Sequence, residues 1–211
     1  MPKQWSTKNL TIIKAPTSCE SGIGRFEFTD DYSVFHYSKM PDKIEDKGES
    51  LCQMASFSLK LLEQAGIPTH LIKIINSKTI EIQLLRLLYP QNNEITQGDK
   101  NYIIPLQIIC RNSLPQGASL FRRLENDSIN IQEVGLLKIP KPGEKLPKPI
   151  IEFTTKLEEI DRFISEDEAK QIACLGKNQL NEVKNIALRV NEVITKHAES
   201  LGLVHADSKI E

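Results

Sequence analysis

The sequence predicts a protein of mixed class, in which short strands are combined with a few helices. Runs of β-branched residues indicate the strands, a polar turn at 76–78 between two such runs indicates a hairpin, and two long stretches carry apolar residues at helical spacing. With 211 residues, the chain is long enough for one large domain or two small ones, with a core that needs no disulfide.

The N-terminal half is expected to contain strands and one helix. The helix spans about 49–65, because apolar residues recur there at helical spacing and Gly66 and Pro68 follow. The strands are expected at 10–13, 25–28, 70–75 and 79–89. Between them, 32–50 and 90–101 are polar, and we expect loops there, the first of which runs into the start of the helix.

The C-terminal half is expected to contain further strands and two longer helices. A strand at 102–110 includes Pro105, which indicates a sheet edge or a bulge because proline cannot donate to a strand ladder. The prolines in 139–149 predict an extended connector rather than a central strand. Helices are expected at about 165–176, where Ser165 and Glu168 form a capping-box pattern, and at 179–201, which Gly202 follows. A weaker helical signal lies at 119–124. Strands are expected at 150–154 and 203–211.

Charge and targeting signals argue against several classes of protein. The 27 basic and 28 acidic side chains give a net charge of −1, which gives no general support for binding nucleic acid or an anionic membrane. No apolar run approaches the roughly 18 residues of a membrane span. The first residues carry no secretion signal, so we expect a cytoplasmic protein.

The four cysteines are Cys19, Cys52, Cys110 and Cys174, and no two of them are close in the sequence. Without a CxxC pair, neither a zinc site nor a dithiol redox site is expected. We expect reduced thiols that serve as small apolar residues.

Alternating charges close the chain. Asp207, Lys209 and Glu211 are two residues apart, so a strand places all three side chains on one face. Two carboxylates beside an ammonium could hold Mg²⁺ and a phosphate. The alternative is a solvated face with cross-strand ion pairs, which is the commoner use of such spacing.

Arginines dominate the segment 110–124. Arg111, Arg122 and Arg123 surround a Pro-Gly turn and Ser119, and arginine forks suit phosphate and carboxylate groups. The alternative is a polar loop followed by a basic surface helix. Phe121 is the one aromatic residue in this segment, whereas single-stranded nucleic acid is bound by several aromatic residues that stack on successive bases.

Two weaker signals remain. Lys156, Asp161 and Arg162 cluster after the strand at 150–154, where a solvated loop is the alternative to a site. Lys47 and Gly48 precede the first helix, whose N-terminal amides could hold an anion, although simple capping is the more common arrangement.

Seven segments, taken in chain order, resemble the SAICAR synthetase family of purine biosynthesis. The stretch IPLQIICRN followed by GASLFRRL is the most specific of them, and the closing D-x-K-x-E comes next. The segments are FTDDYSVF (28–35), MPDKIEDKGESL (40–51), LLEQAGIPTH (61–70), IPLQIICRN (104–112), GASLFRRL (117–124), PIIEFTTK (149–156) and HADSKIE (205–211).

The resemblance implies roles for individual residues. It implies substrate binding by Arg111, Ser119, Arg122, Arg123 and Asp161, nucleotide binding by Lys14, Asp207, Lys209 and Glu211, and Mg²⁺ binding by Glu211. It implies no protein nucleophile, and it makes 88–102 the hinge that touches adenine.

The chain departs from the family pattern at several positions. Lys14 and Arg25 lie in the region of the usual GKxK motif, His36 replaces an aspartate, and Gln107 replaces a glutamate. The family continues beyond the position of Glu211 with FG and an acidic segment. We therefore expect the present chain to bind Mg·ATP weakly.

The implied fold is α+β, with an N-terminal antiparallel β lobe, a central α+β lobe, C-terminal helices and an ATP cleft between lobes. We place the lobes at 1–100 and 101–211. The implied reaction joins L-aspartate to carboxyaminoimidazole ribotide and consumes ATP, so the partners are small molecules, and a homo-oligomer is compatible with it. The alternative is a non-catalytic or truncated protein of this fold that binds a nucleotide or ribotide.

Overall fold

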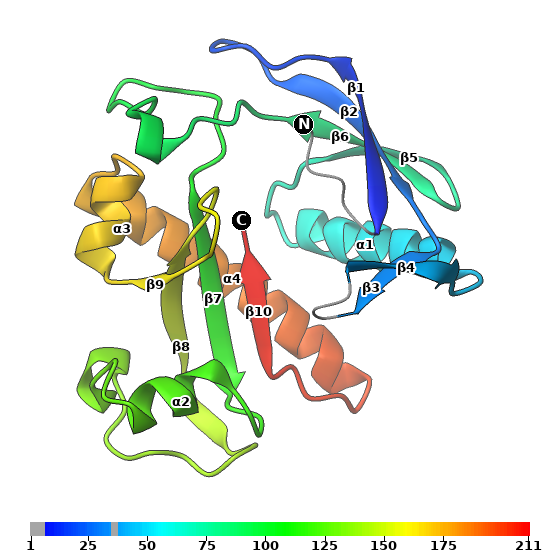
Figure 1. The fold of residues 1–211 in the computed structure, drawn as a ribbon. Coiled ribbons are helices and arrows are strands. Elements are labelled where there is room, and N and C mark those ends of the chain that lie inside the picture. The colour runs from blue at the N-terminus through cyan, green and yellow to red at the C-terminus, as the bar shows by residue number, and fades with distance from the viewer. Residues whose placement is uncertain (1–6, 35–37) are drawn as a thin grey trace. The chain divides into compact units, whose positions relative to one another are not determined.

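The computed structural model describes residues 7–34 and 38–211 and has the α+β class that the sequence predicts (Figure 1). The chain forms two compact units, Met1–Leu87 with Asp99–Tyr102 and Leu88–Gly98 with Ile103–Glu211, here named the first and second units. Each unit contains a four-stranded antiparallel sheet. No helix within the described residues is long and apolar enough to cross a bilayer.

The first unit is built on a sheet of strand order β1-β2-β6-β5. Its strands are β1 (Lys8–Lys14), β2 (Gly22–Phe28), β5 (Leu71–Asn76) and β6 (Thr79–Leu84), and the helix α1 spans Lys47–Gln64. The predicted hairpin is confirmed, because β5 and β6 pair across a tight turn. Phe28, Cys52, Ile80 and Ile82 form the buried core between helix and sheet.

The start of α1 shows why Lys47-Gly48 precedes it. The backbone N–H of Gly48 donates to Asp30 Oδ1 at 2.8 Å, so a carboxylate of the chain itself satisfies the helix N-terminus. This bond, with one from Lys78, holds the pKa of Asp30 below its ordinary value. A side chain at position 48 would meet the carbonyl oxygen of Phe28 at 2.7 Å, so only glycine fits. Capping, rather than an external anion, therefore explains this motif.

The second unit is built on a sheet of strand order β10-β7-β8-β9. Its strands are β7 (Leu106–Ser113), β8 (Lys145–Thr155), β9 (Phe163–Ile164) and β10 (Asp207–Ile210), and its helices are α2 (Ser119–Glu125), α3 (Glu166–Ile172) and α4 (Lys177–Ser200). Alternate side chains of β7, namely Leu106, Ile108 and Cys110, pack with Ala169 of α3 and with Leu180 and Ala187 of α4. The opposite face of the sheet is left for Gln107 and Arg111.

A smaller core supports one end of this sheet. Leu114, Leu120, Leu136, Leu146 and Ile150 are buried together, which fixes α2 and the following 3₁₀ turn (Ile131–Val134) beside β8. The helix α2 carries Ser119 and Arg123, so this packing decides where those two side chains lie.

Several predicted boundaries are wrong. The strand expected at 102–110 begins only at Leu106, after buried Pro105, and the strand expected at 203–211 is limited to Asp207–Ile210. The stretch expected to be a loop before α1 contains a small hairpin of β3 (Asp31–Val34) and β4 (Ser38–Lys43). Charged residues on these short strands interrupt the alternation of polar and apolar residues that would have predicted them.

The proline-rich segment is also corrected. Its last residues, from Lys145, already belong to β8, which is an inner strand of the sheet. The prolines are tolerated because the ladder with β7 is irregular there: Arg111 pairs with Ile150, whereas Ser113 pairs with Lys145.

The helical predictions are confirmed to within a few residues. Ser165 accepts a hydrogen bond from the backbone N–H of Glu168, and Gly202 follows α4 with a φ of 72°. The Glu168 carboxylate bonds to Arg162 instead of closing the capping box.

Candidate functional site

Polar side chains gather on the face of the second sheet that is opposite to α3 and α4, here named the polar face. It carries Gln107 and Arg111 of β7, Glu152 and Thr154 of β8, and Asp207 and Lys209 of β10. Cross-strand pairing places Asp207 opposite Arg111, and Lys209 in one row with Ile109 and Glu152. The hydroxyl of Thr154 is buried on this face and has no hydrogen-bond partner among the described residues.

Arg111 lies at the centre of the polar face and is only 5% exposed. Its Nε donates to Glu152 Oε2 at 2.6 Å, and its Nη2 donates to Ser119 Oγ at 3.1 Å. Its Nη1 lies 3.6 Å from Asp207 Oδ2, whose side chain is 41% exposed. Glu152 and Ser119 thus fix one side of the guanidinium, and the exposed carboxylate of Asp207 lies on the other side.

Glu152 joins two arginines from different elements. Besides Arg111, its other carboxylate oxygen accepts a hydrogen bond from Arg123 Nη1 of α2. The Arg123 guanidinium also stacks 3.7 Å from the centre of the Phe163 ring. The sequence analysis did not identify Glu152, although a lone carboxylate between Ile151 and Phe153 was a usable signal.

A second group of charges forms where the chain ends. Lys156 Nζ lies 2.9 Å from Glu211 Oε1 and 3.6 Å from Asp161 Oδ2. Gln107 Nε2 donates to the same Glu211 oxygen at 2.9 Å. Burial alone would lower the pKa of Lys156, but Glu211 and Asp161 together raise it above its ordinary value. Lys156 therefore stays charged at neutral pH.

Lys209 completes the polar face. It is exposed, and within the described parts of the chain no carboxylate pairs with it. The alternation that predicted one face for Asp207, Lys209 and Glu211 is confirmed by their contacts, because Asp207 meets Arg111 and Glu211 meets Gln107 on the same side of β7. Lys209 therefore presents an exposed ammonium on the same face of the sheet as the anchored guanidinium of Arg111.

The residues present do not fit a protein-held Mg²⁺. Across residues 7–34 and 38–211, no three carboxylate, imidazole or thiolate side chains meet as a metal site. Glu211 is held by Lys156 and Gln107, and Asp207 faces Arg111. We therefore derive no step through a metal ion.

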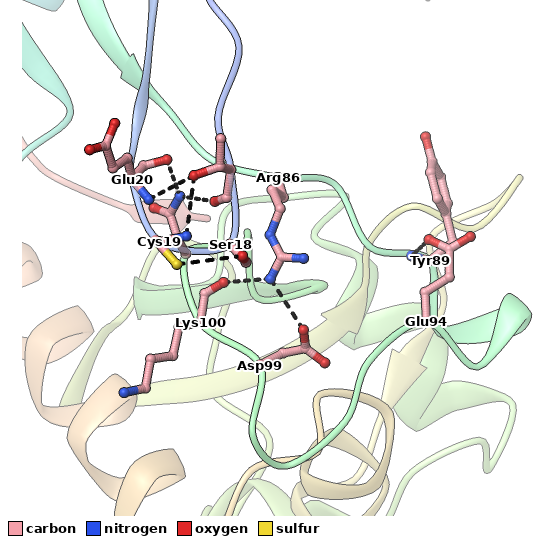
Figure 2. A network of polar contacts seen from close by, with 10 residues as sticks. Ser18, Cys19, Glu20, Arg86, Tyr89, Glu94, Asp99 and Lys100 are labelled. Carbon is pink, nitrogen blue, oxygen red and sulfur yellow. Dashed lines mark hydrogen bonds and ion pairs between the residues drawn. The ribbon is translucent and has the colours of Figure 1, made fainter.

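Lys14 belongs to the first unit. Its Nζ lies 2.6 Å from Glu20 Oε2 across the β1–β2 turn, and this pairing lowers the pKa of Glu20. The same turn lies in a network of polar contacts (Figure 2), in which Arg86 donates to the carbonyl oxygen of Lys100 at 2.6 Å and pairs with Asp99 at 3.2 Å. The turn itself is held by the Thr17 hydroxyl, which accepts from the backbone N–H groups of Cys19 and Glu20, and by Asn101, whose side-chain amide donates to the carbonyl oxygen of Glu20 at 2.5 Å.

The remaining predicted residues lie apart from these groups. Arg122 is exposed, and it belongs neither to the charged residues around Glu152 nor to those around Lys156. His36 lies outside the described residues. In contrast, the fold brings Arg111, Ser119, Arg123 and Asp207 together around Glu152, and Asp161 and Glu211 together around Lys156.

Comparison with known proteins shows which family the chain belongs to. A family model described as SAICAR synthetase matches residues 19–211. The chain belongs to the SAICAR synthetase family. A relative from Thermoplasma acidophilum, named phosphoribosylaminoimidazole-succinocarboxamide synthase, is 36% identical over 88% of this chain and 61% of its own length. A relative from Archaeoglobus fulgidus, which carries the same name provisionally, is 38% identical over 98% of this chain and 66% of its own length.

Solved structures of the SAICAR synthetase family have the same fold. A SAICAR synthetase in complex with ADP has a TM-score of 0.71 and 25% identity over 98% of this chain and 72% of that one. The enzyme from Pyrococcus horikoshii OT3 has a TM-score of 0.69 and 25% identity over 96% of this chain and 72% of that one. The chain therefore spans less than two thirds of the length of these curated relatives and somewhat more of the solved chains.

Proposed function

We propose that the protein carrying this chain is a ligase of purine biosynthesis that joins L-aspartate to carboxyaminoimidazole ribotide, with conversion of ATP to ADP and phosphate. Family membership and the names of the relatives support the reaction. The observation that carries the proposal is the polar face together with its neighbours. Arg111 and Lys209 present cations from the sheet, Arg123 presents one from α2, and Lys156 presents one from the residue after β8.

The chemistry that we propose needs such a face. A carboxylate is a poor acyl donor, so the γ-phosphoryl group of ATP is first transferred to an oxygen of the ribotide carboxylate, which gives an acyl phosphate and ADP. The amine of aspartate then attacks the acyl carbon, the amide bond forms, and phosphate leaves with the bridging oxygen. Both steps concentrate negative charge, which arginine and lysine side chains stabilise without a protein nucleophile.

We assign the anionic groups of the ribotide to Arg111 and its neighbours. The fork of Arg111 has donors left on its open side, Ser119 steadies it, and Arg123 lies across the shared carboxylate. We assign Asp161, which lies 3.6 Å from Lys156 Nζ, to the orientation of the aspartate amine or the ribotide. Arg122, which is exposed, meets substrate only at the rim of the site.

We assign the nucleotide to the region of Lys209, Glu211 and Asp207 in the second unit. Lys209 has no carboxylate partner among the described residues and can pair directly with a phosphate. The complex of a SAICAR synthetase with ADP supports a nucleotide site in this fold.

A coupled assay for ADP release tests the proposal. The purified protein is given ATP, carboxyaminoimidazole ribotide and L-aspartate, and each substrate is omitted in turn. We expect ADP release beyond one equivalent per protein only when all three are present, because aspartate must consume the acyl phosphate before the next turnover. Sustained release that does not depend on aspartate would contradict the ligase reaction, and ribotide binding without any release would favour the non-catalytic alternative.

A further inference from the structure

The structure contains one buried carboxylate whose place in the site no sequence pattern assigned. Glu152 is 6% exposed, and its two oxygens accept from Arg111 and from Arg123. We infer that Glu152 is a positioning residue for the ribotide: it sets the direction in which both guanidinium groups present their remaining donors. This inference rests on the proposed function and names a residue that acts through the two arginines.

The geometry separates the fixed donors of Arg111 from the free ones. A guanidinium has five N–H donors in one plane. Glu152 takes Nε, and Ser119 takes one donor of Nη2. The remaining Nη2 and Nη1 donors therefore point away from Glu152, toward the open side where Asp207 lies 3.6 Å away. Because the plane is anchored at its inner edge, a bidentate ligand meets an already oriented fork.

Arg123 is anchored in the same way. The bond to Glu152 fixes its Nη1, and the Phe163 ring supports the flat face of its guanidinium. Arg111 comes from β7 and Arg123 from α2, and Glu152 is the group that binds both guanidiniums, while Ser119 of α2 adds a second link between Arg111 and that helix. The backbone reinforces this position, because the neighbours Ile151 and Phe153 pack into the opposite core and hold Glu152 on the polar side.

Charge also argues for more than a structural role. One carboxylate between two guanidiniums leaves a net positive charge at the centre of the face, and Asp207 balances it only loosely and from an exposed position. An anionic group can replace Asp207 without disturbing the buried pair. Without Glu152 the buried cation of Arg111 and the half-buried cation of Arg123 would lose their shared carboxylate, and we expect them to turn away from the common direction.

Binding of carboxyaminoimidazole ribotide, measured by calorimetry without ATP, tests the inference in the protein and in Glu152→Gln and Glu152→Asp variants. We expect the ribotide affinity of Glu152→Gln to fall about tenfold or more, with ATP affinity unchanged. Glu152→Asp keeps the charge but shortens the side chain, so we expect a smaller loss. The exposed Glu182 of α4 provides the matched control, and Glu182→Gln should bind as the parent does.

Nuclear magnetic resonance of arginine side chains measures how fast the Nε–H of Arg111 exchanges with water. If Glu152 had only a structural role, adding ribotide would not change this rate in the Glu152→Gln variant. In the parent, the Nε–H signal of Arg111 should be slow to exchange with water and should stay so when ribotide binds. In Glu152→Gln it should exchange quickly until ribotide is added. Ribotide affinity equal to the parent in Glu152→Gln, or in Glu152→Asp if the first variant does not fold, would overturn the inference.

Failure of the proposed function is distinguishable from failure of this inference. If the parent binds inorganic phosphate but not ribotide, the proposed function is wrong. Phosphate is then the probe: weaker phosphate binding by Glu152→Gln supports the positioning role, and equal binding overturns it.

Discussion

Asn112 and Asn191 exchange side-chain hydrogen bonds of 3.0 and 2.8 Å and so join β7 directly to α4. Asn191 is 3% exposed, and the pair is continued by Thr195, whose hydroxyl lies 2.8 Å from His205 Nδ1. The backbone N–H of Asn112 donates to the carbonyl oxygen of Ala206 at 2.8 Å. The amide pair therefore fixes the segment that leads into β10, and with it the position of Asp207 and Lys209.

Asn191→Ala should loosen that segment. The change leaves the half-buried Asn112 amide with fewer partners, which costs about 1 kcal/mol in the free energy of unfolding. Hydrogen exchange should become faster along β10 before it does in β8. Asn185→Ala, an exposed position on the same helix, is the control. Equal protection of β10 in both variants would show that the pair does not hold the strand.

Gly48→Ala should destabilise the first unit. The added methyl group would meet Phe28 O at 2.7 Å and Asp30 Oδ1 at 3.0 Å, so either the α1 cap or the strand must shift. Overpacking of this kind costs about 1–3 kcal/mol, measurable by urea unfolding. Gly98→Ala is the matched control, because no atom lies within 4 Å of its added group. A stability loss as large for Gly98→Ala would contradict the steric explanation.

Arg111→Ala should weaken ribotide binding by about 2–5 kcal/mol, because it removes a charge-assisted fork from a buried position. ATP binding should change little. The variant also leaves Glu152 with one cation, so we expect a lower melting temperature as well. Arg111→Lys keeps the charge but loses the forked donors of the guanidinium. Compared with Arg111→Ala, it should recover more of the melting temperature than of the ribotide affinity. Calorimetry separates the two effects, and unaltered ribotide affinity in Arg111→Ala would remove Arg111 from the site.

The thiols should differ in reactivity. All four cysteines are free, with Cys19 exposed and Cys110 buried, and burial raises the pKa of Cys110 from 9.0 to about 11. Alkylation at pH about 8 should modify Cys19 and spare Cys110, because only the thiolate reacts. Mass spectrometry of the unreduced protein checks both this order and the expected absence of disulfides. Modification of Cys110 as fast as Cys19 would show that its burial is transient.

The same pKa shift predicts a loss of stability at alkaline pH. Below 9.0 the Cys110 thiol is protonated in both states, whereas between 9.0 and about 11 it ionises only in the unfolded chain. The unfolded state therefore binds fewer protons there, and the free energy of unfolding falls as the pH rises through this window. Cys110→Ala should make that fall less steep in urea unfolding at several pH values.

The main elements of the fold were accessible from the sequence because their patterns are local. Helical spacing located α1 and α4, and a polar turn located the β5–β6 hairpin. The β3–β4 hairpin was missed because its strands are short and their charged residues and Pro41 leave no clear alternation of polar and apolar residues. Proline composition mispredicted the start of β8, since a bulged ladder removes the hydrogen bonds that proline cannot make.

The candidate site was accessible only in part. Spacing along one strand placed Asp207, Lys209 and Glu211 on a common face, because alternation is a property of the strand alone. The pairing of Arg111 and Arg123 through Glu152 depends on register between β7 and β8 and on the position of α2. Such relationships join residues far apart in the chain, and no local pattern contains them.

The central claim is that ATP activates a carboxylate of the ribotide, which then receives the amine of aspartate. The direct test supplies ribotide with a heavy-oxygen label in that carboxylate, together with ATP and L-aspartate, and examines the released phosphate by mass spectrometry. The account predicts one labelled oxygen in each phosphate, because the bridging oxygen leaves with phosphorus. Unlabelled phosphate released together with ADP would contradict it.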